Sequence, residues 1–335
     1  MKIVVDIAHP AHVNFFKNAL RTLARAGHQV MITGLRRGKL PSILENELSE
    51  FPIHYVGKHR GTKFSIIVEA NLLKFIRLFF LVRKERPDFG LSVGSFTLGG
   101  VLKLFGKPNV QFDDDPERPV NVFLEKLTST RLFFPPIVAP QKNVGTMGAL
   151  KEWAYLSPRY FTASTDGLSA YNLVPKQYIF VREISTGSLN YADQEANTVA
   201  SFAEQLPTRY PVLLSLEDKR MLGAYPPHWT ILQEPVADIH SLIYYSCLVI
   251  SSGDSMAREG ALLGVPSLYV GSREMKANAM MEERKMLFQC AASEAPGLVD
   301  GITNKTLTVP AQDEFRAQLL AEWDDITQLI VSQIN

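Results

Sequence analysis

The chain is poor in several features that mark common protein classes. Its 335 residues include only two cysteines, Cys247 and Cys290, too few for a disulfide framework or a cysteine-rich metal site. Both lie in apolar stretches, which is typical of buried free thiols in a reducing cytoplasm. The formal net charge is only +1, so charge gives no reason to expect a nucleic-acid partner.

Long hydrophobic runs are also scarce. The apolar stretch Leu72–Val82 has only 11 residues and contains Lys74 and Arg77, whereas a membrane-spanning helix needs about 20 apolar residues. The N-terminus reads as a first strand and not as a signal peptide. We expect a cytoplasmic protein in which this stretch is a helix packed on a sheet. The alternative is a patch that lies on the inner face of the membrane and meets a lipid-linked acceptor, because three basic residues follow within 83–86.

Two nucleotide-binding patterns are missing. The pattern Gly-x-x-x-x-Gly-Lys-Ser/Thr is absent, which argues against a P-loop NTPase. Gly-x-Gly-x-x-Gly does not follow the first expected strand, which argues against a nicotinamide dehydrogenase.

What the chain does have is a regular alternation of strands and helices. We expect strands at 3–7, 29–33, 53–56, 87–93, 109–112, 178–181, 211–216, 229–232, 247–250 and 267–270. We expect helices at 14–26, 40–48, 64–86, 98–105, 195–205, 239–245, 254–263 and 313–334. Strands separated by helices favour parallel sheets covered on both faces.

The alternation is interrupted once, by an irregular stretch at 135–164 that is rich in Pro and Gly. We therefore expect an α/β protein with two Rossmann-like domains, at 1–164 and 165–315, whose sheets face each other across a cleft. A last helix at 316–335 is expected to return to the first domain. Ligands of such sheets bind at the carboxyl ends of the strands.

The most informative segment is the strand–turn–helix unit at 247–264. The turn contains Ser252, Gly253 and Ser255, and it places free N–H groups at a helix N-terminus, where an anion is favoured. Glu259 follows about one turn into that helix, where its carboxylate can accept hydrogen bonds from a sugar diol. The unit therefore predicts a nucleotide-sugar site. Arg182, after an earlier strand, is a candidate clamp for the diphosphate, with a structural ion pair as the alternative.

Two histidines follow the first strand, in the expected loop 8–14. His12 is our candidate for a base that takes a proton from an acceptor hydroxyl, and His9 is a candidate for the acceptor site. The alternative is that one of them caps the helix or packs locally.

Acidic and small residues follow two further strands. One of Asp113, Asp114 and Asp115, with Asp114 as our choice, is expected to orient the histidine. The alternatives are a divalent cation site and a solvated turn with a capping Asp. Ser95 lies in a turn at 94–100 that could admit the acceptor, although its glycines are explained equally well by tight helix–sheet packing.

Three segments make the chain resemble a known superfamily. The segments 9–16 and 24–30, HPAHVNFF and ARAGHQV, are similar to the opening of GT-B glycosyltransferases, a superfamily that includes UDP-N-acetylglucosamine 2-epimerases. The segment 252–266, SGDSMAREGALLGVP, is similar to their nucleotide-sugar motif. The chain looks closest to bacterial and archaeal GT-B-like proteins that mostly lack an assigned activity. The chain departs from the superfamily at Asp254, where a second Gly is common, and at Gly260, where Ala is frequent.

The resemblance implies a GT-B fold and places His12 where several such enzymes have their catalytic base. It implies that the small residues of the turn bind diphosphate and that Glu259 binds ribose. We expect transfer of a sugar from a nucleotide sugar, with UDP as the expected nucleotide, to a glycan or lipid-linked acceptor in surface polysaccharide or glycolipid synthesis. We expect no metal and no cofactor.

Two alternatives remain at this stage: a nucleotide-sugar epimerase or hydrolase, and a non-catalytic sugar-nucleotide-binding protein. The base, the sugar, the acceptor, the stereochemistry and the oligomeric state remain open.

Overall fold

A computed structural model describes residues 1–58, 71–185, 197–236 and 238–334. The chain forms two compact units. The N-terminal unit comprises Met1–Tyr155 and Trp323–Asn335, and the C-terminal unit comprises Leu156–Glu322. The boundary lies earlier in the chain than the one expected at 164.

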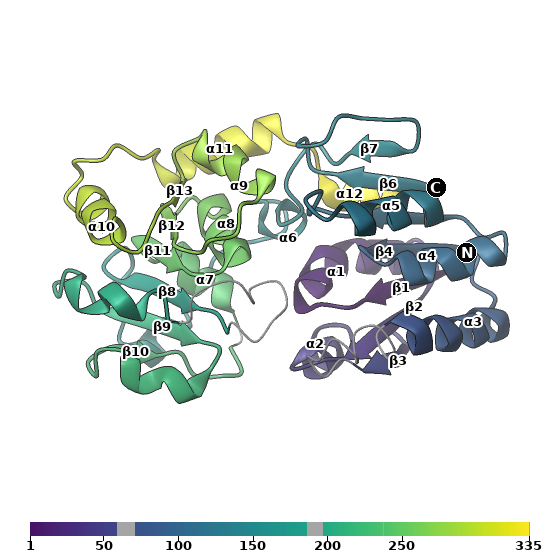
Figure 1. Ribbon diagram of the computed structural model, residues 1–335, viewed down its shortest axis with the longest axis horizontal. Helices are drawn as coiled ribbons and strands as arrows, with labels where there is room; N and C mark the ends of the chain where they lie inside the picture. Colours follow the sequence, from purple (N-terminus) through teal and green to yellow (C-terminus); the bar gives the residue numbers. More distant parts are fainter. Residues whose placement is uncertain (59–70, 186–196, 237, 335) are drawn as a thin grey trace. The chain divides into compact units, whose positions relative to one another are not determined.

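The N-terminal unit is built on a seven-stranded sheet in the order β3-β2-β1-β4-β5-β6-β7, in which every strand pair is parallel (Figure 1). Its strands are β1 (Lys2–Ile7), β2 (Gln29–Arg36), β3 (Ile53–Lys58), β4 (Phe89–Val93), β5 (Asn109–Phe112), β6 (Arg131–Phe134) and β7 (Val144–Thr146). The interiors of the five central strands are buried, as expected for a parallel sheet covered on both faces, whereas the edge strands β3 and β7 are partly exposed.

The helices of this unit divide between the two faces of the sheet. They are α1 (Pro10–Arg25), α2 (Leu40–Glu47), α3 (Lys74–Glu85), α4 (Phe96–Leu104), α5 (Pro119–Thr128) and α12 (Ile326–Ser332). Right-handed crossovers and the observed packing place α1, α2 and α12 on one face and α3, α4 and α5 on the other (Figure 1). The short helix α6 (Trp153–Leu156) lies at the unit boundary.

The C-terminal unit has a six-stranded parallel sheet in the order β10-β9-β8-β11-β12-β13. Its strands are β8 (Ile179–Glu183), β9 (Val212–Leu216), β10 (Thr230–Ile231), β11 (Leu248–Ser251), β12 (Ser267–Tyr269) and β13 (Leu287–Gln289). Its helices are η2 (Ser169–Tyr171), η4 (Ala200–Gln205), η5 (Lys219–Ala224), α7 (Ile239–Tyr244), α8 (Asp254–Leu262), α9 (Lys276–Glu282), α10 (Ala295–Thr303) and α11 (Gln312–Glu322).

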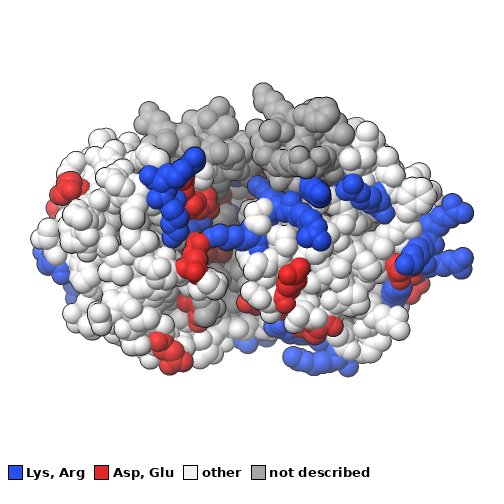
Figure 2. Space-filling view, turned by 90° about the horizontal axis from the view of Figure 1, so that it is seen from below, with Lys and Arg blue, Asp and Glu red and all other residues white. Residues whose placement is uncertain are grey.

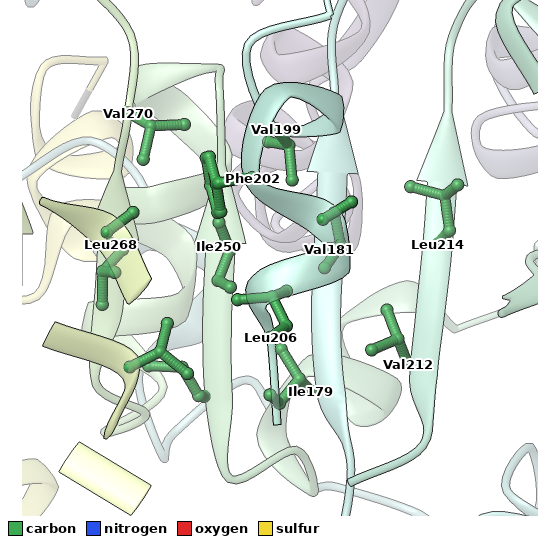
Figure 3. Close-up of a cluster of buried hydrophobic side chains, with 14 of the residues drawn as sticks. Ile179, Val181, Val199, Phe202, Leu206, Val212, Leu214, Ile250, Leu268 and Val270 are labelled. Atoms are coloured by element: carbon green, nitrogen blue, oxygen red, sulfur yellow. The ribbon is translucent and has the colours of Figure 1, made fainter. Parts of the chain in front are cut away.

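One face of this sheet forms a large hydrophobic core. Figure 3 shows Ile179 and Val181 of β8, Leu214 of β9 and Ile250 of β11 beside Phe202 of η4. Alternate residues of each strand reach this face because side chains alternate along a strand. The core fixes the sheet whose carboxyl edge carries the strongest sequence motif.

The fold prediction is confirmed: the chain has two Rossmann-like α/β domains with parallel sheets. Within the described ranges, no helix is both long enough and apolar enough to cross a bilayer.

Several element boundaries were wrong. Helix α1 begins at Pro10 and not at Asn14, since proline is favoured at a first helical position and the side chain of His9 caps the helix. The irregular stretch 135–164 contains β7 and α6, and helix α5 and strand β6 were not expected. The final helical stretch is two helices, because Asp325 caps α12 by accepting from the N–H of Gln328. Parts of two expected helices, 64–70 and 195–196, lie outside the described residues.

Candidate functional site

The turn between β11 and α8 leaves backbone donors open. The N-cap residue of α8 is Gly253, which has no side chain with which to cap the helix. Its own N–H donates to Oγ of Ser251 at 3.0 Å. The amides of Ser255 and Met256 have no hydrogen-bond partner among the described residues. Unsatisfied N–H groups and the helix dipole favour an anion at this point.

The predicted small residues of the turn have different surroundings. Ser252 is fully buried, and its Oγ accepts from the N–H of Ile184 at 3.0 Å, which ties the turn to the end of β8. Gly253 is confined by packing, since a Cβ there would lie 2.7 Å from Cγ2 of Ile184. Ser255 is half-buried and makes no side-chain hydrogen bond within the described part of the chain. Its hydroxyl is therefore available to a ligand.

Glu259 lies farther along α8, and only 11% of its side chain is exposed. Its Oε2 is 3.5 Å from Nε2 of His240, near the start of α7. A carboxylate buried to this extent needs a partner, and the imidazole supplies one. The ring of His240 also contacts Phe161 edge-on, with the ring centroids 6.2 Å apart. Glu259 is thus largely buried and held in place by the imidazole.

The unexpected acid of the motif, Asp254, is turned into the unit. It is 1% exposed, and its Oδ2 is 3.0 Å from Nη1 of Arg258 and 4.0 Å from Nη1 of Arg273. Arg258 also donates to Oδ1 of Asn278 at 3.1 Å. Because the carboxylate is buried and paired with a cation, its charge is neutralised beside the open amides.

The other departure, Gly260, has a packing cause. A Cβ at this position would lie 2.4 Å from Oγ of Ser267 and 2.8 Å from Cγ2 of Val249. Helix α8 therefore lies too close to β11 and β12 for an alanine. The glycine fixes how α8 sits on the sheet, and so where its N-terminus and Glu259 lie.

Arg182, the candidate diphosphate clamp, is already paired. Its Nη1 donates to Oγ of Ser215 at 2.8 Å, and its Nη2 forms an ion pair with Oε1 of Glu217. Glu217 in turn accepts from the N–H of Ser185 at 2.9 Å. Arg182 lies at the carboxyl end of β8, beside β11, but two of its three nitrogens already have protein partners.

In the N-terminal unit, the two predicted histidines lie at the start of α1. Nδ1 of His9 accepts from the N–H of Ala11 at 3.2 Å, so His9 caps the helix. His12 is half-buried, and its ring centroid is 5.8 Å from that of His9. Its Nδ1 is buried and has no hydrogen-bond partner among the described residues.

Burial and nearby positive charges favour the neutral form of His12. Desolvation is the main cause that lowers the pKa of His12 well below its usual value, and the charges of His9, Lys151, Lys74 and Arg37 add to it. A neutral imidazole has a free lone pair, which a general base requires.

Asp114 is buried and pairs with a lysine. Its Oδ2 is 2.6 Å from Nζ of Lys151, the same lysine that lowers the pKa of His12. The side chains of His12, Lys151 and Asp114 therefore lie in one neighbourhood at the carboxyl edge of the sheet. No hydrogen bond joins Asp114 to Nδ1 of His12, so the orienting role of Asp114 stays a prediction.

Asp113 and Glu125 form a second buried acidic pair. They hydrogen-bond to each other, and burial together with the negative charge of neighbouring acids raises the pKa of both. Oδ1 of Asp113 also accepts from the N–H groups of Asp114 and Asp115, at 2.8 and 3.3 Å. Asp113 and Asp114 are therefore buried, and the alternative of a solvated turn was wrong. In the described ranges, no group of three or more potential His, Cys, Asp or Glu ligands is arranged to hold a metal ion.

Ser95 belongs to a buried polar network. Its Oγ donates to Oδ2 of Asp6 at 2.5 Å, and Nζ of Lys74 donates to the same oxygen at 2.5 Å. The residue is only 4% exposed. A Cβ at Gly99 would lie 2.2 Å from Nε2 of Gln111, which favours tight packing as the reason for the glycines of this segment.

Sequence reasoning missed the partners that hold these residues in place. His240, Lys151 and Asn278 occur in no motif and reach their partners only through the fold. Arg258 lies within the motif, but its pairing with Asp254 was not predicted. His240 was assigned to a helix, but nothing in the sequence linked it to Glu259, which lies 19 positions later.

Comparison with known proteins places the chain in a family and a fold. The chain belongs to the family described as "Protein of unknown function (DUF354)", which matches residues 1–148 and 160–335. It is 20% identical over 289 residues to the uncharacterized protein MJ0665 of Methanocaldococcus jannaschii, covering 82% of this chain and 83% of that one.

Solved structures show the same fold at low sequence identity. UDP-GlcNAc 2-epimerase from Neisseria meningitidis, bound to UDP-GlcNAc, superposes with a TM-score of 0.65 at 13% identity, covering 100% of this chain and 99% of that one. The glycosyltransferase VinC, in complex with DTDP, superposes with a TM-score of 0.67 at 14% identity, covering 100% and 98%. The chain therefore has the fold shared by GT-B glycosyltransferases and UDP-GlcNAc 2-epimerases.

Proposed function

We propose that the chain binds a nucleotide sugar, with UDP as the expected nucleotide, through its C-terminal unit and transfers the sugar to an acceptor. The observation that carries this proposal is Glu259, a carboxylate paired with His240 on the helix whose N-terminal amides are open. A ribose diol can donate to this carboxylate while phosphate accepts from the amides and the hydroxyl of Ser255.

The members of the donor site contribute in different ways. The amides of Ser255 and Met256 and the hydroxyl of Ser255 bind the diphosphate. Ser252 and Gly253 act mainly by shaping the turn, because the Ser252 hydroxyl and the Gly253 amide already have protein partners. Arg182 contributes least to diphosphate binding, since Glu217 and Ser215 already occupy two of its nitrogens.

The acceptor side is proposed separately, on the N-terminal unit. His12 takes the proton from the acceptor hydroxyl, Lys151 and Asp114 define the charge around it, and His9 and Ser95 fix the local structure. No step in this proposal needs a metal, because the amides and dipole of α8 stabilise the departing diphosphate. The expected setting, synthesis of surface polysaccharide or glycolipid, is part of the proposal.

A nucleotide-sugar epimerase is the second candidate, because the fold is shared with UDP-GlcNAc 2-epimerases. The two reactions separate when the purified chain is incubated with UDP-N-acetylglucosamine without an acceptor. An epimer or rapid hydrolysis would favour the second candidate, and stable binding without turnover would fit a transferase that lacks its acceptor. A non-catalytic binding protein would keep its cellular role in a His12→Ala variant.

The donor site is tested by a thermal-shift screen with nucleoside diphosphates and their sugars. We expect UDP or a related nucleotide to raise the melting temperature, since a ligand that binds only the native state stabilises it by mass action. The Glu259→Gln variant, which keeps the shape of the side chain, should lose most of that rise. If no nucleotide raised the melting temperature, the donor-site assignment would be contradicted.

A further inference from the structure

Most of the large apolar side chains that are exposed among the described residues lie on one face of the N-terminal unit. Ten large hydrophobic side chains are exposed among the described residues, and seven of them come from helices α3, α4 and α5 or the turn before α3. These seven, which we call the apolar face, are Leu72, Ile76, Phe80, Leu104, Val120, Phe123 and Leu127. Exposed apolar residues scattered singly need no explanation, but a concentration on neighbouring helices does.

The spacing of these residues makes the face continuous along each helix. Ile76 and Phe80 are four positions apart, so they lie on one side of α3, and Phe80 is 60% exposed. Leu72 is two positions before the start of α3 and is 57% exposed. Val120, Phe123 and Leu127 recur with helical spacing on α5. Helix α4 packs between α3 and α5 and adds Leu104, so all seven belong to one side of the sheet (Figure 1).

The charged side chains of the three helices that carry the apolar face are mostly basic. The solvent-facing charged residues of the three helices are Arg77, Arg83, Lys84, Lys103, Lys126 and Glu85. Glu85, the one acid in this set, is itself paired with Lys2 at 2.6 Å. Figure 2 shows basic side chains projecting at the right-hand end of the N-terminal unit, with acidic side chains among them.

One lysine of this set is fixed next to the apolar side chains. Nζ of Lys103 donates to the carbonyl of Leu127 at 2.6 Å, which joins the C-terminal ends of α4 and α5. The ammonium therefore lies beside Leu104 and Leu127, which are 67% and 53% exposed. Apolar side chains rimmed by cations match an anionic bilayer, which offers hydrocarbon below a layer of phosphates.

We propose that the α3–α4–α5 face docks the chain on the surface of an anionic phospholipid membrane. A second copy of the chain is a poor match, because a two-fold interface would bring the same basic side chains against one another. The proposal does not depend on the nucleotide-sugar site. A Glu259→Gln variant should bind membranes as the parent chain does, so failure of either proposal can be recognised separately.

The test is co-sedimentation of the full chain with vesicles of phosphatidylcholine alone or with 30% phosphatidylglycerol. We expect binding only to the anionic vesicles, and we expect 0.5 M salt to weaken it because salt screens surface charge. The Arg83→Gln, Lys84→Gln, Lys103→Gln triple variant should bind about 100-fold more weakly, since each basic residue near such a surface contributes about fivefold.

The apolar contribution is tested by a Phe80→Ser, Phe123→Ser variant, which should lose at least tenfold in vesicle binding. Leu222→Ser is the matched control, because Leu222 is 44% exposed in the C-terminal unit and should have no effect. Equal binding to both vesicle types, or unchanged binding by both multiple variants, would overturn the proposal. So would a dimer in sedimentation velocity that Phe123→Ser dissociates, since the face would then be covered by a second copy.

Discussion

At the scale of single residues, His12, the base in our proposal, has a lowered pKa. Its pKa is lowered by burial and by the cations around it, so the unfolded chain binds the proton more tightly than the folded one. The stability contribution of neutral His12 is therefore present above about pH 6.5, the pKa of an unperturbed histidine, and is lost as the pH falls below that value.

This predicts a pH-dependent effect of one substitution. Protonation of His12 should lower the free energy of unfolding of the wild-type chain between pH 6.5 and pH 5, by up to about 1.4 kcal/mol per pH unit. The His12→Gln variant should lack this decrease. Urea unfolding at several pH values measures it. Parallel profiles for the two proteins would show that the folded state does not depress the pKa of His12.

The pKa of Glu125 is shifted in the opposite direction to that of His12, so its effect on stability has the opposite dependence on pH. Burial and the negative charge of Asp113 raise the pKa of Glu125, so the folded chain holds its proton more tightly than the unfolded chain. Stability from this group is fully present near pH 4.5 and is lost as the pH rises towards the raised pKa. Glu125→Gln, which keeps a donor for Asp113, should be more stable than wild type at pH 8 and should lose the advantage near pH 5.

The matched control for this comparison is Glu314→Gln, because Glu314 is exposed on α11. The control should leave the pH profile of urea unfolding unchanged. If Glu125→Gln were less stable than wild type at pH 8, the acidic pair would be stabilising in its charged form and our account of it would be wrong.

At the scale of elements, the position of α8 depends on Gly260. An alanine there would force its Cβ into Ser267 and Val249, so Gly260→Ala should lower the free energy of unfolding by about 1–3 kcal/mol. Gly297→Ala is the control, since a Cβ at that position of α10 meets nothing within 4 Å. The control should be neutral or stabilise the protein by about 0.4–1 kcal/mol. Equal stability of the two variants would contradict the close packing of α8 on its sheet.

The sequence predicted most elements of the fold because parallel strands carry continuous apolar runs and the helices have clear periodicity. It failed where local signals were ambiguous. Helix α5 was hidden because it exposes Val120, Phe123 and Leu127, so its apolar residues did not mark a core-facing side. The short strand β7, only three residues long, was lost in a segment rich in turn-forming residues.

The candidate site was predictable in its motif and not in its partners. Glu259 and the turn at 252–255 follow a local pattern of strand, turn and helix. The links from Glu259 to His240, and from Asp114 to Lys151, join residues far apart in sequence and depend on how the helices pack. Arg182 was ambiguous because an arginine at a strand end suits both a phosphate and a carboxylate, and the fold supplies the carboxylate of Glu217.

At the scale of the whole molecule, the two units carry different parts of the proposed chemistry. The C-terminal unit has the open amides and Glu259, which suit a nucleotide sugar. The N-terminal unit has His12 and its charged neighbours, and its opposite helical layer has the apolar face. Each unit can therefore be tested through its own ligand in the full chain.

The central claim is that Glu259 and the start of α8 bind a nucleoside diphosphate, and calorimetric titration of UDP into the full chain tests it most directly. We predict saturable one-to-one binding that weakens about tenfold or more in Glu259→Gln, the loss expected when hydrogen bonds to a charged acceptor are removed, and that is unchanged in Glu314→Gln. Absence of binding to the wild-type chain, or equal affinity for wild type and Glu259→Gln, would contradict the account.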